Sequence, residues 1–245
     1  MRRTAPLLRR GGFFELRLDR VQPAELTPYL EEHASTASQR LQLFPGWLGA
    51  WKTELGGNLG EVRSLYHWRS YSERERARAA ARDPAAAADV PFPSMRAKLR
   101  SADAAVFVEA EDCLAAAGLH GACAFANPEG VCEEGPVAWE LRTYQLVLGY
   151  GTVPKFLDLY AEGLRDKLSV DDSGASELVT LLYSDNGPLN VVHEVWRHQS
   201  MQRAQDSRVA SRKAVKWRAA VEQIAQLATS FETRYIRPLP GAPWQ

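Results

Sequence analysis

The sequence predicts an α+β fold made of two copies of one β-α-β-β-α-β unit. The strand-like run Phe14–Arg17 recurs as Trp139–Arg142, an offset of 140 − 15 = 125 residues between the two glutamates. After each run the same patterns follow: an amphipathic helix, two β-rich runs, a second helical region and a last strand. Such a unit is a ferredoxin-like sandwich, in which a four-stranded antiparallel sheet carries helices on one face and leaves the other bare.

The elements of the first copy follow in order from local patterns. Alternating and β-rich residues indicate strands near 14–17, 47–54, 59–68 and 104–108. Gly56–Asn58 predicts a hairpin turn between the second and third strands, because Gly and Asn accept positive φ. Helical spacing indicates one helix around Tyr29 and another from Ser72 to Leu99, which is interrupted at Asp83-Pro84 because proline cannot continue a helix.

The second copy repeats this order with different loop lengths. We expect strands near 139–144, 178–185, 189–198 and 230–236, a helix around Phe156, and one continuous helix from Ser200 to Leu227. The apolar stripe of that last helix is Trp217, Val221, Ile224 and Ala228. Most of the tryptophans lie in the predicted strands or on this apolar stripe, and we therefore expect them in the core: Trp47, Trp51, Trp68, Trp139, Trp196 and Trp217.

Two copies can hide their bare sheet faces against each other. Packed sheet to sheet, they would form an intramolecular α/β barrel of the kind that single copies make by dimerising. The domains expected are a basic N-terminal tail (1–11), the first repeat (12–110), a linker (111–136), the second repeat (137–237) and a Pro-rich tail (238–245). The Pro-rich tail is either a packed cap with Trp244 inserted or a short interaction tail.

Composition excludes several classes of function. The chain has 30 basic and 30 acidic residues, so no net field attracts nucleic acid, and no apolar run reaches the roughly 18 residues of a membrane span. We expect a soluble protein. Cys113, Cys123 and Cys132 cannot all pair with one another, which favours a reducing compartment. With His120 they offer four zinc ligands, but no Cys-x-x-Cys is present, and we expect neither a metal nor a cofactor.

The order of several motifs resembles the NIPSNAP family. These motifs are residues 139–144, Trp51–Glu54, Gly187–Val192 and Trp196-Arg197, and the resemblance extends over both copies, from about Gly12 to Arg237. It implies a dimeric α/β-barrel fold, a mitochondrial location, and roles in mitochondrial quality control or vesicle-related processes through protein partners. Four arginines and no acid in residues 1–10 are compatible with an import presequence or with a basic tail, and a cytoplasmic protein is the alternative.

One motif departs from the family pattern. Where the family commonly has a histidine on its third strand, this chain has Ser64 in the first copy and Glu194 in the second. His193 lies one position earlier, and a one-residue offset in a strand points a side chain to the opposite face. A role that needs the family histidine is therefore not transferred to this chain.

The candidate site comprises Glu15, Arg17, Glu140, Arg142 and Tyr144. Alternation places the glutamates and arginines on one face of their strands, and because the apolar face is expected to meet the helices, we expect the charged face to look into the space between the two sheets. In one interpretation these residues form ion pairs that fix how the halves dock. In the other, an arginine binds the carboxylate or phosphate of a ligand in a barrel pocket.

A second candidate is a basic surface on the last long helix. Arg208, Arg212, Lys213 and Lys216 stand there with few acids nearby, as either a contact surface for an acidic partner or anionic lipid, or a solvated helix face. No catalytic motif accompanies His33, His67, His193 or His198. We therefore expect a non-enzymatic protein that acts through unidentified protein partners and possesses no catalytic residues. The alternative is a small-molecule-binding or monooxygenase-like enzyme that uses the barrel interior.

Overall fold

The computed structural model describes residues 11–82, 92–128, 136–171 and 174–245. The chain divides into two compact units. The first comprises Met1–Phe107 and Arg237–Gln245, and the second comprises Val108–Ile236. Residues 1–10 of the predicted basic tail, and Cys132, lie outside the described residues.

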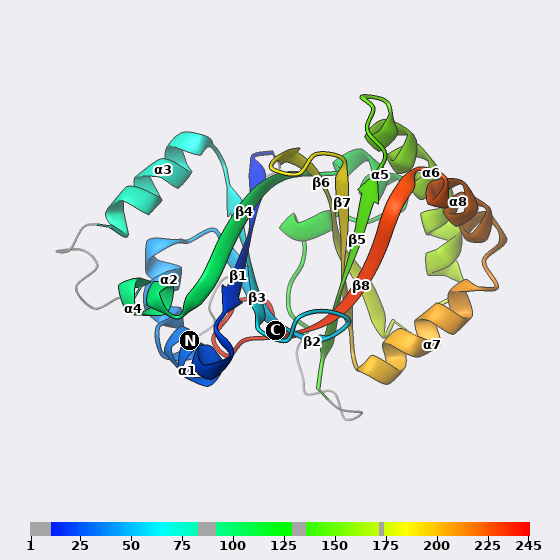
Figure 1. The fold of residues 1–245 in the computed structure, drawn as a ribbon. Coiled ribbons are helices and arrows are strands. Elements are labelled where there is room, and N and C mark those ends of the chain that lie inside the picture. The colour runs from blue at the N-terminus through cyan, green and yellow to red at the C-terminus, as the bar shows by residue number, and fades with distance from the viewer. Residues whose placement is uncertain (1–10, 83–91, 129–135, 172–173) are drawn as a thin grey trace. The chain divides into compact units, whose positions relative to one another are not determined.

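The first unit contains the first β-α-β-β-α-β copy (Figure 1). Its elements are β1 (Phe13–Val21), the 3-10 helix η1 (Pro23–Glu25), α1 (Leu26–Ser35), α2 (Ala37–Leu43), β2 (Trp47–Leu55), β3 (Glu61–Trp68), α3 (Tyr71–Ala80), α4 (Phe92–Ala97) and β4 (Leu99–Glu109). β1 pairs antiparallel with both β3 and β4, and β2 pairs with the other edge of β3. In Figure 1, α1 to α4 lie together on one side of these strands.

The second unit contains the second copy. Its elements are α5 (Glu111–Ala116), the 3-10 helix η2 (Gly121–Cys123), β5 (Ala138–Leu146), α6 (Thr152–Ser169), β6 (Ser176–Asn186), β7 (Val191–His198), α7 (Met201–Ser211), α8 (Val215–Ala225) and β8 (Ala228–Pro238). β5 pairs antiparallel with β7 and β8, and β6 pairs with the other edge of β7.

The strand order confirms the predicted fold class. Hydrogen-bonded neighbours follow the order β2-β3-β1-β4 in the first copy and β6-β7-β5-β8 in the second, and every pairing is antiparallel. Within each copy the first strand lies between the third and fourth, as in a ferredoxin-like sandwich.

The two copies also share details of the backbone. The β1–β4 register shifts at Arg20/Val21, and the β5–β8 register shifts at the equivalent Gln145/Leu146. Ser70 caps α3 and Ser200 caps α7, each side chain accepting a backbone N–H from three residues further on. Gly56, with φ of +81°, lies between β2 and β3, so the predicted hairpin turn is confirmed. The shared register shifts and serine caps therefore place equivalent side chains at equivalent positions in the two copies.

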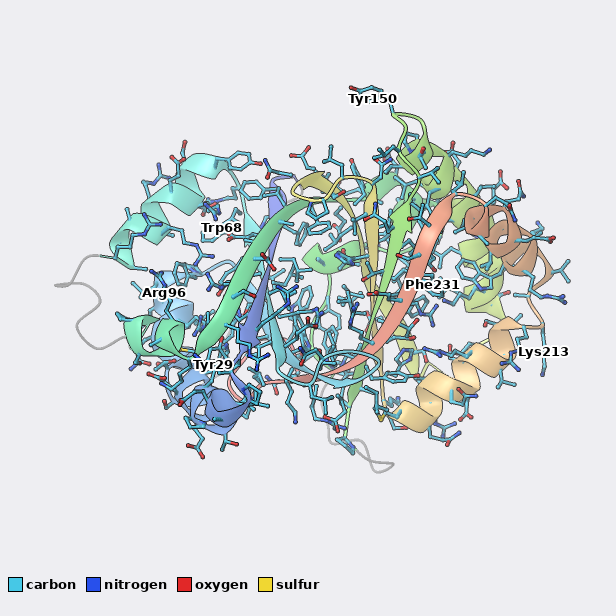
Figure 2. All side chains as sticks on the ribbon, in the orientation of Figure 1. Tyr29, Trp68, Arg96, Tyr150, Lys213 and Phe231 are labelled. Atoms are coloured by element: carbon cyan, nitrogen blue, oxygen red, sulfur yellow. The ribbon has the colours of Figure 1, made fainter. Side chains whose placement is uncertain are left out.

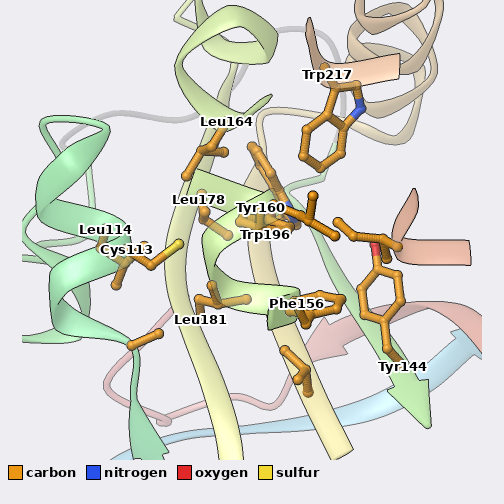
Figure 3. Close-up of a cluster of buried hydrophobic side chains, with 14 of the residues drawn as sticks. Cys113, Leu114, Tyr144, Phe156, Tyr160, Leu164, Leu178, Leu181, Trp196 and Trp217 are labelled. Carbon is orange, nitrogen blue, oxygen red and sulfur yellow. The ribbon is translucent and has the colours of Figure 1, made fainter. Parts of the chain in front are cut away.

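Aromatic residues dominate the core of each unit. In the second unit the rings of Phe156, Tyr160, Trp196 and Trp217 pack between α6, α8 and the sheet (Figure 3). The six tryptophans predicted to be core residues are all buried. Gly163 lets α6 and α8 approach closely, because a Cβ at that position would lie 2.9 Å from the Cβ of Ala220.

The prediction of one continuous helix from Ser200 to Leu227 is wrong. The chain leaves the helix after α7, and Ala214 is extended and buried before α8 begins. Asp166 of α6 caps the new helix, accepting the backbone N–H of Lys216 at 2.8 Å and of Trp217 at 3.3 Å. This cap comes from a distant segment, so no local pattern signals the break. Val221 is 38% exposed and Ala228 begins β8, so neither belongs to the buried stripe.

The Pro-rich segment is a packed cap of the first unit. Leu239 and Trp244 donate backbone hydrogen bonds of 2.8 Å to Ala50 and Leu48 of β2. The Trp244 ring is buried with its centroid 6.3 Å from that of Trp51. Of the two interpretations of this segment, the structure therefore supports the inserted cap. Among the described residues, no helix has both the length and the apolar character needed to cross a bilayer.

Candidate functional site

The glutamates of the predicted site, Glu15 on β1 and Glu140 on β5, point toward the helices of their own unit. The Glu15 carboxylate accepts hydrogen bonds from Arg74 at 2.8 and 2.9 Å, from Arg78 at 3.0 Å and from the Trp68 indole at 2.9 Å. Both arginines belong to α3. The prediction that the glutamates and arginines face the space between the sheets is therefore wrong.

The physical reason lies in the partners that the helices supply. A charged strand face packs under helices when those helices bring opposite charges and hydrogen-bond donors, since a buried charge is tolerated when it is paired. In the first unit α3 brings Arg74 and Arg78, and in the second unit α7 brings Arg208 to Glu140. The assumption that only an apolar face can meet the helices omitted these partners.

In the second unit the predicted residues form one buried polar cluster. Arg142 donates to both oxygens of Glu140 at 3.0 Å and to Glu194 at 3.5 Å. Tyr144 donates to Glu194 at 2.5 Å, and the Trp196 indole donates to the same carboxylate at 2.6 Å. Neither glutamate side chain has exposed surface. Glu140 and Arg142 do form an ion pair, but it lies within the second copy and under its helices, so a role in docking the two halves stays a prediction.

The electrostatics of this cluster follow from its pairing. Burial raises the pKa of Glu140, but the hydrogen bond from His198 and the charge of Arg142 outweigh burial and hold that pKa well below its usual value. Burial lowers the pKa of His198, so the ring is neutral near pH 7. A carboxylate can only accept, so Nε2 of His198 carries the proton given to Glu140 at 3.1 Å, and Nδ1 accepts from Ser176 at 2.8 Å. Glu140 and Arg142 are therefore both charged in the folded protein.

Lys167 of α6 completes the cluster and was missed by the sequence reasoning. Its Nζ lies 3.8 Å from the ring centroid of Trp196 and 4.6 Å from that of Trp217, and has no hydrogen-bond partner among the described residues. Burial, with the nearby charge of Arg142, lowers the pKa of Lys167 to about 7. The two indoles and the Lys167 side chain occupy the space between the helices and the sheet.

In the first unit the corresponding space is open. A cavity of about 220 Å³ lies between β1 and the helices, and Figure 2 shows two of its lining residues, Tyr29 on α1 and Arg96 on α4. Its wall holds two carboxylates, Glu15 and Asp19, and six arginines: Arg17, Arg40, Arg74, Arg78, Arg82 and Arg96. Arg17 donates to Asp19 at 2.8 Å instead of pairing with Glu15. The two copies have thus diverged from one plan into a filled cluster and an open cavity.

Repeat equivalence explains this divergence residue by residue. Arg17 pairs with Ser64 across β1 and β3, and Arg142 pairs with Glu194 across β5 and β7. The position that holds a carboxylate in the second copy therefore holds a short hydroxyl in the first. The same alignment matches Arg40 with Lys167, at an offset of 127 residues, so this cation position was detectable from the repeat.

The predicted basic surface is divided by the structure. Arg208 turns inward to Glu140, with its guanidinium 5.5 Å from the ring centroid of Tyr235. Arg212, Lys213 and Lys216 are exposed, and Figure 2 shows Lys213 at the outer end of α7, where the chain turns into α8. Three of the four predicted residues therefore remain available to a partner.

The histidines are used structurally. His33 is fully buried with its ring 5.7 Å from that of Trp47, and burial lowers its pKa. His67 Nε2 donates to the Gly11 carbonyl at 2.9 Å, and His193 Nδ1 lies 3.0 Å from the Thr143 hydroxyl. Cys113 is buried in the second core, which raises its thiol pKa to about 12. A neutral buried thiol is a poor nucleophile.

The fold defines a class, that of tandem ferredoxin-like α+β proteins in which the first strand of each copy carries a buried glutamate paired with arginine of the helix that follows the third strand. The sequence profile of the NIPSNAP family matches residues 14–113 and 139–243. The chain belongs to the NIPSNAP family.

Relatives and solved structures agree with this assignment. Protein NipSnap homolog 2 of Homo sapiens is 30% identical over 117 residues, which are 48% of this chain and 38% of that protein. The match thus spans well under half the length of this relative. Two solved structures share the fold over almost the whole chain. A putative monooxygenase of Fusobacterium nucleatum has 9% identity, covers 94% of both chains and gives a TM-score of 0.59. One of Lactobacillus acidophilus has 8% identity, covers 93% of this chain and 94% of its own, and gives 0.56.

Proposed function

We propose that this NIPSNAP-family chain acts by binding a protein partner and not by catalysis, and that the partner binds at the junction of α7 and α8. The observation that carries the proposal is the exposed basic face formed by Arg212, Lys213, Lys216 and Arg218. The four cations outnumber the acids beside them, Glu222 in the same groove and Asp166 at the start of α8, and such an excess of positive charge favours an oppositely charged surface.

The chemistry of this surface indicates the kind of partner. Val215 is 76% exposed amid the basic face. A shallow groove of about 640 Å³, lined by Arg212, Val215, Val221 and Arg218, runs over Trp217. An acidic segment with an apolar side chain at its centre matches both the charge and the groove. We propose such a segment as the occupant.

The family resemblance supports the finer part of this proposal. We propose a mitochondrial location and a role in quality control or vesicle-related processes, carried out through the partner. The alternative of a monooxygenase-like enzyme has the shared fold as its support, and a fold at 8 to 9% identity does not carry an activity.

A labelled acidic peptide tests the partner surface. The probe is a fluorescein-labelled 12-residue peptide of alternating acidic residues and leucine, followed by anisotropy. We expect binding that weakens with salt and is lost in the charge reversal Lys213→Glu with Lys216→Glu. Lys155→Glu, an exposed reversal on α6, is the matched control and should bind as the wild type does. Equal binding by the double reversal would refute this surface.

A reporter fusion tests the location. Residues 1–12 fused to a fluorescent protein should direct it to mitochondria if this basic stretch is an import signal. A fusion spread evenly through the cytosol would contradict import by this segment.

A further inference from the structure

We propose that the first repeat binds a small carboxylate in its cavity, with the anionic group held where the second repeat holds the carboxylate of Glu194. This site is in the first unit, far in sequence from the basic face of α7 and α8, so it stands or falls independently of the proposed partner surface.

The second repeat shows what this position recognises. The Glu194 carboxylate receives hydrogen bonds from Arg142, from the Tyr144 hydroxyl and from the Trp196 indole, all within the buried cluster. A guanidinium with two neutral donors on a protected carboxylate is a common arrangement for binding an organic acid. Here the carboxylate is covalently part of the chain.

The first repeat keeps cationic and hydroxyl groups at this place but lacks the carboxylate. Arg17 is equivalent to Arg142 and Tyr66 is equivalent to Trp196, and both line the cavity. Ser64 stands at the position of Glu194 and carries no charge. Asp19 replaces Tyr144, and the Tyr29 hydroxyl donates to it at 2.8 Å. Two of the three donors of the built-in site therefore have counterparts, Arg17 and Tyr66, while the third position holds Asp19, which pairs with Arg17, and the place of the Glu194 carboxylate is not filled by an acid.

The charge balance of the cavity independently favours an anion. Six arginines and two carboxylates line it, an excess of four positive charges. Glu15 is satisfied by Arg74 and Arg78, and Asp19 by Arg17. Arg82 and Arg96, both exposed, have no ion-pair partner in the part of the chain that the structure describes. They place positive charge beside the cavity, where it attracts an entering anion.

Size and lining define the rest of the ligand. About 220 Å³ is below the roughly 300 to 1,000 Å³ of drug-sized sites, so the ligand is small. Phe44 after α2, Met95 on α4 and Leu99 at the start of β4 provide apolar parts of the wall. These features fit a monocarboxylate with a short apolar body better than inorganic phosphate, which has no apolar part.

Calorimetric titration in a buffer free of carboxylate and phosphate tests the assignment. The probes are benzoate and hexanoate. Benzamide serves as the neutral counterpart of benzoate, and inorganic phosphate serves as an anion without an apolar part. We expect benzoate or hexanoate to bind and both comparison compounds to bind at least roughly tenfold more weakly. No binding of either carboxylate at tens of millimolar, or equal binding of benzamide or phosphate, would overturn the proposal.

Variants locate the binding. Ser64→Glu copies the second repeat and should abolish carboxylate binding by supplying an internal anion to Arg17. Arg82→Gln and Arg96→Gln should each weaken binding several-fold without affecting folding, because both side chains are exposed. Arg218→Gln on α8 is the matched control and should bind as the wild type does. Wild-type affinity in folded Ser64→Glu protein, or in both Gln variants if Ser64→Glu does not fold, would overturn the site.

Discussion

Replacing Arg142 by methionine should destabilise the protein strongly. The guanidinium pairs with Glu140 and Glu194, two carboxylates whose side chains have no exposed surface. After the change, Glu140 keeps Arg208 and His198, whereas Glu194 keeps only the neutral donors Tyr144 and Trp196 among the contacts described above. The variant therefore leaves one buried carboxylate without its paired guanidinium.

The expected loss follows from this unpaired charge. Breaking a buried pair by removing one partner typically costs about 3–5 kcal/mol of unfolding free energy. In a chain of this size each kcal/mol moves the midpoint of thermal unfolding by roughly 2–4 °C, so we expect a fall of roughly 6–20 °C. Arg17→Met is the matched control: its side chain is 28% exposed and pairs with one carboxylate, Asp19, so its fall should be only a few degrees.

Differential scanning calorimetry at several pH values measures both effects. The pKa of Glu140 is lowered in the folded state, so its charged form contributes stability above the ordinary value of 4.5, and this contribution is lost as the pH falls through the lowered pKa. The difference between wild type and Arg142→Met should therefore shrink in acid. A fall below about 3 °C at pH 7, or one no larger than that of Arg17→Met, would refute the buried-pair reasoning.

Three further predictions concern stability. Lys167→Met should raise the free energy of unfolding at pH 7 by an amount on the order of 4 kcal/mol, because the pKa of Lys167, lowered from 10.5 to about 7, makes wild-type stability rise with pH between those values. Urea unfolding should show that the stability difference between variant and wild type vanishes above pH 10.5. A difference that does not change with pH would contradict this prediction. Trp244→Ala should cost about 3 kcal/mol by opening the cap over Trp51, whereas Tyr150→Ala, at a fully exposed residue, should leave the thermal midpoint unchanged; equal midpoints would exclude the cap. Asp166→Ala should cost about 1 kcal/mol by uncapping α8, with Asp166→Asn restoring most of it in chemical denaturation, and no rescue would argue against the cap.

Repetition made the fold predictable from the sequence. Each element predicted in one copy supported the prediction of the same element in the other. The alignment begins at Phe14–Arg17 with Trp139–Arg142 and extends, at nearly the same offset, to the last strand of each copy. The break before α8 could not be predicted in this way. It depends on Asp166 of another helix, and the break predicted for the first copy at Asp83-Pro84 lies outside the described residues.

The candidate site was only partly predictable. Glu140, Arg142 and Tyr144 do form one cluster, because alternation on a strand fixes which side chains share a face. The direction of that face depends on the partners that the helices supply, here Arg74, Arg78 and Arg208, and alternation along a strand does not reveal these partners. If the repeat offset is applied to cations as well as to hydrophobic residues, Arg78 aligns with Arg208, and both are then candidates to pair with the glutamate of their copy.

The discontinuity of the first unit has a consequence for biosynthesis. Its closing segment, Arg237–Gln245, is translated only after every residue of the second unit has been added. Until translation ends, Trp51 lacks its aromatic neighbour Trp244, and the nascent first copy stays incomplete although all its own strands have been synthesised. A gene divided between the repeats therefore encodes a first repeat that lacks its closing segment. Adding that segment as a separate short peptide should complete the first unit.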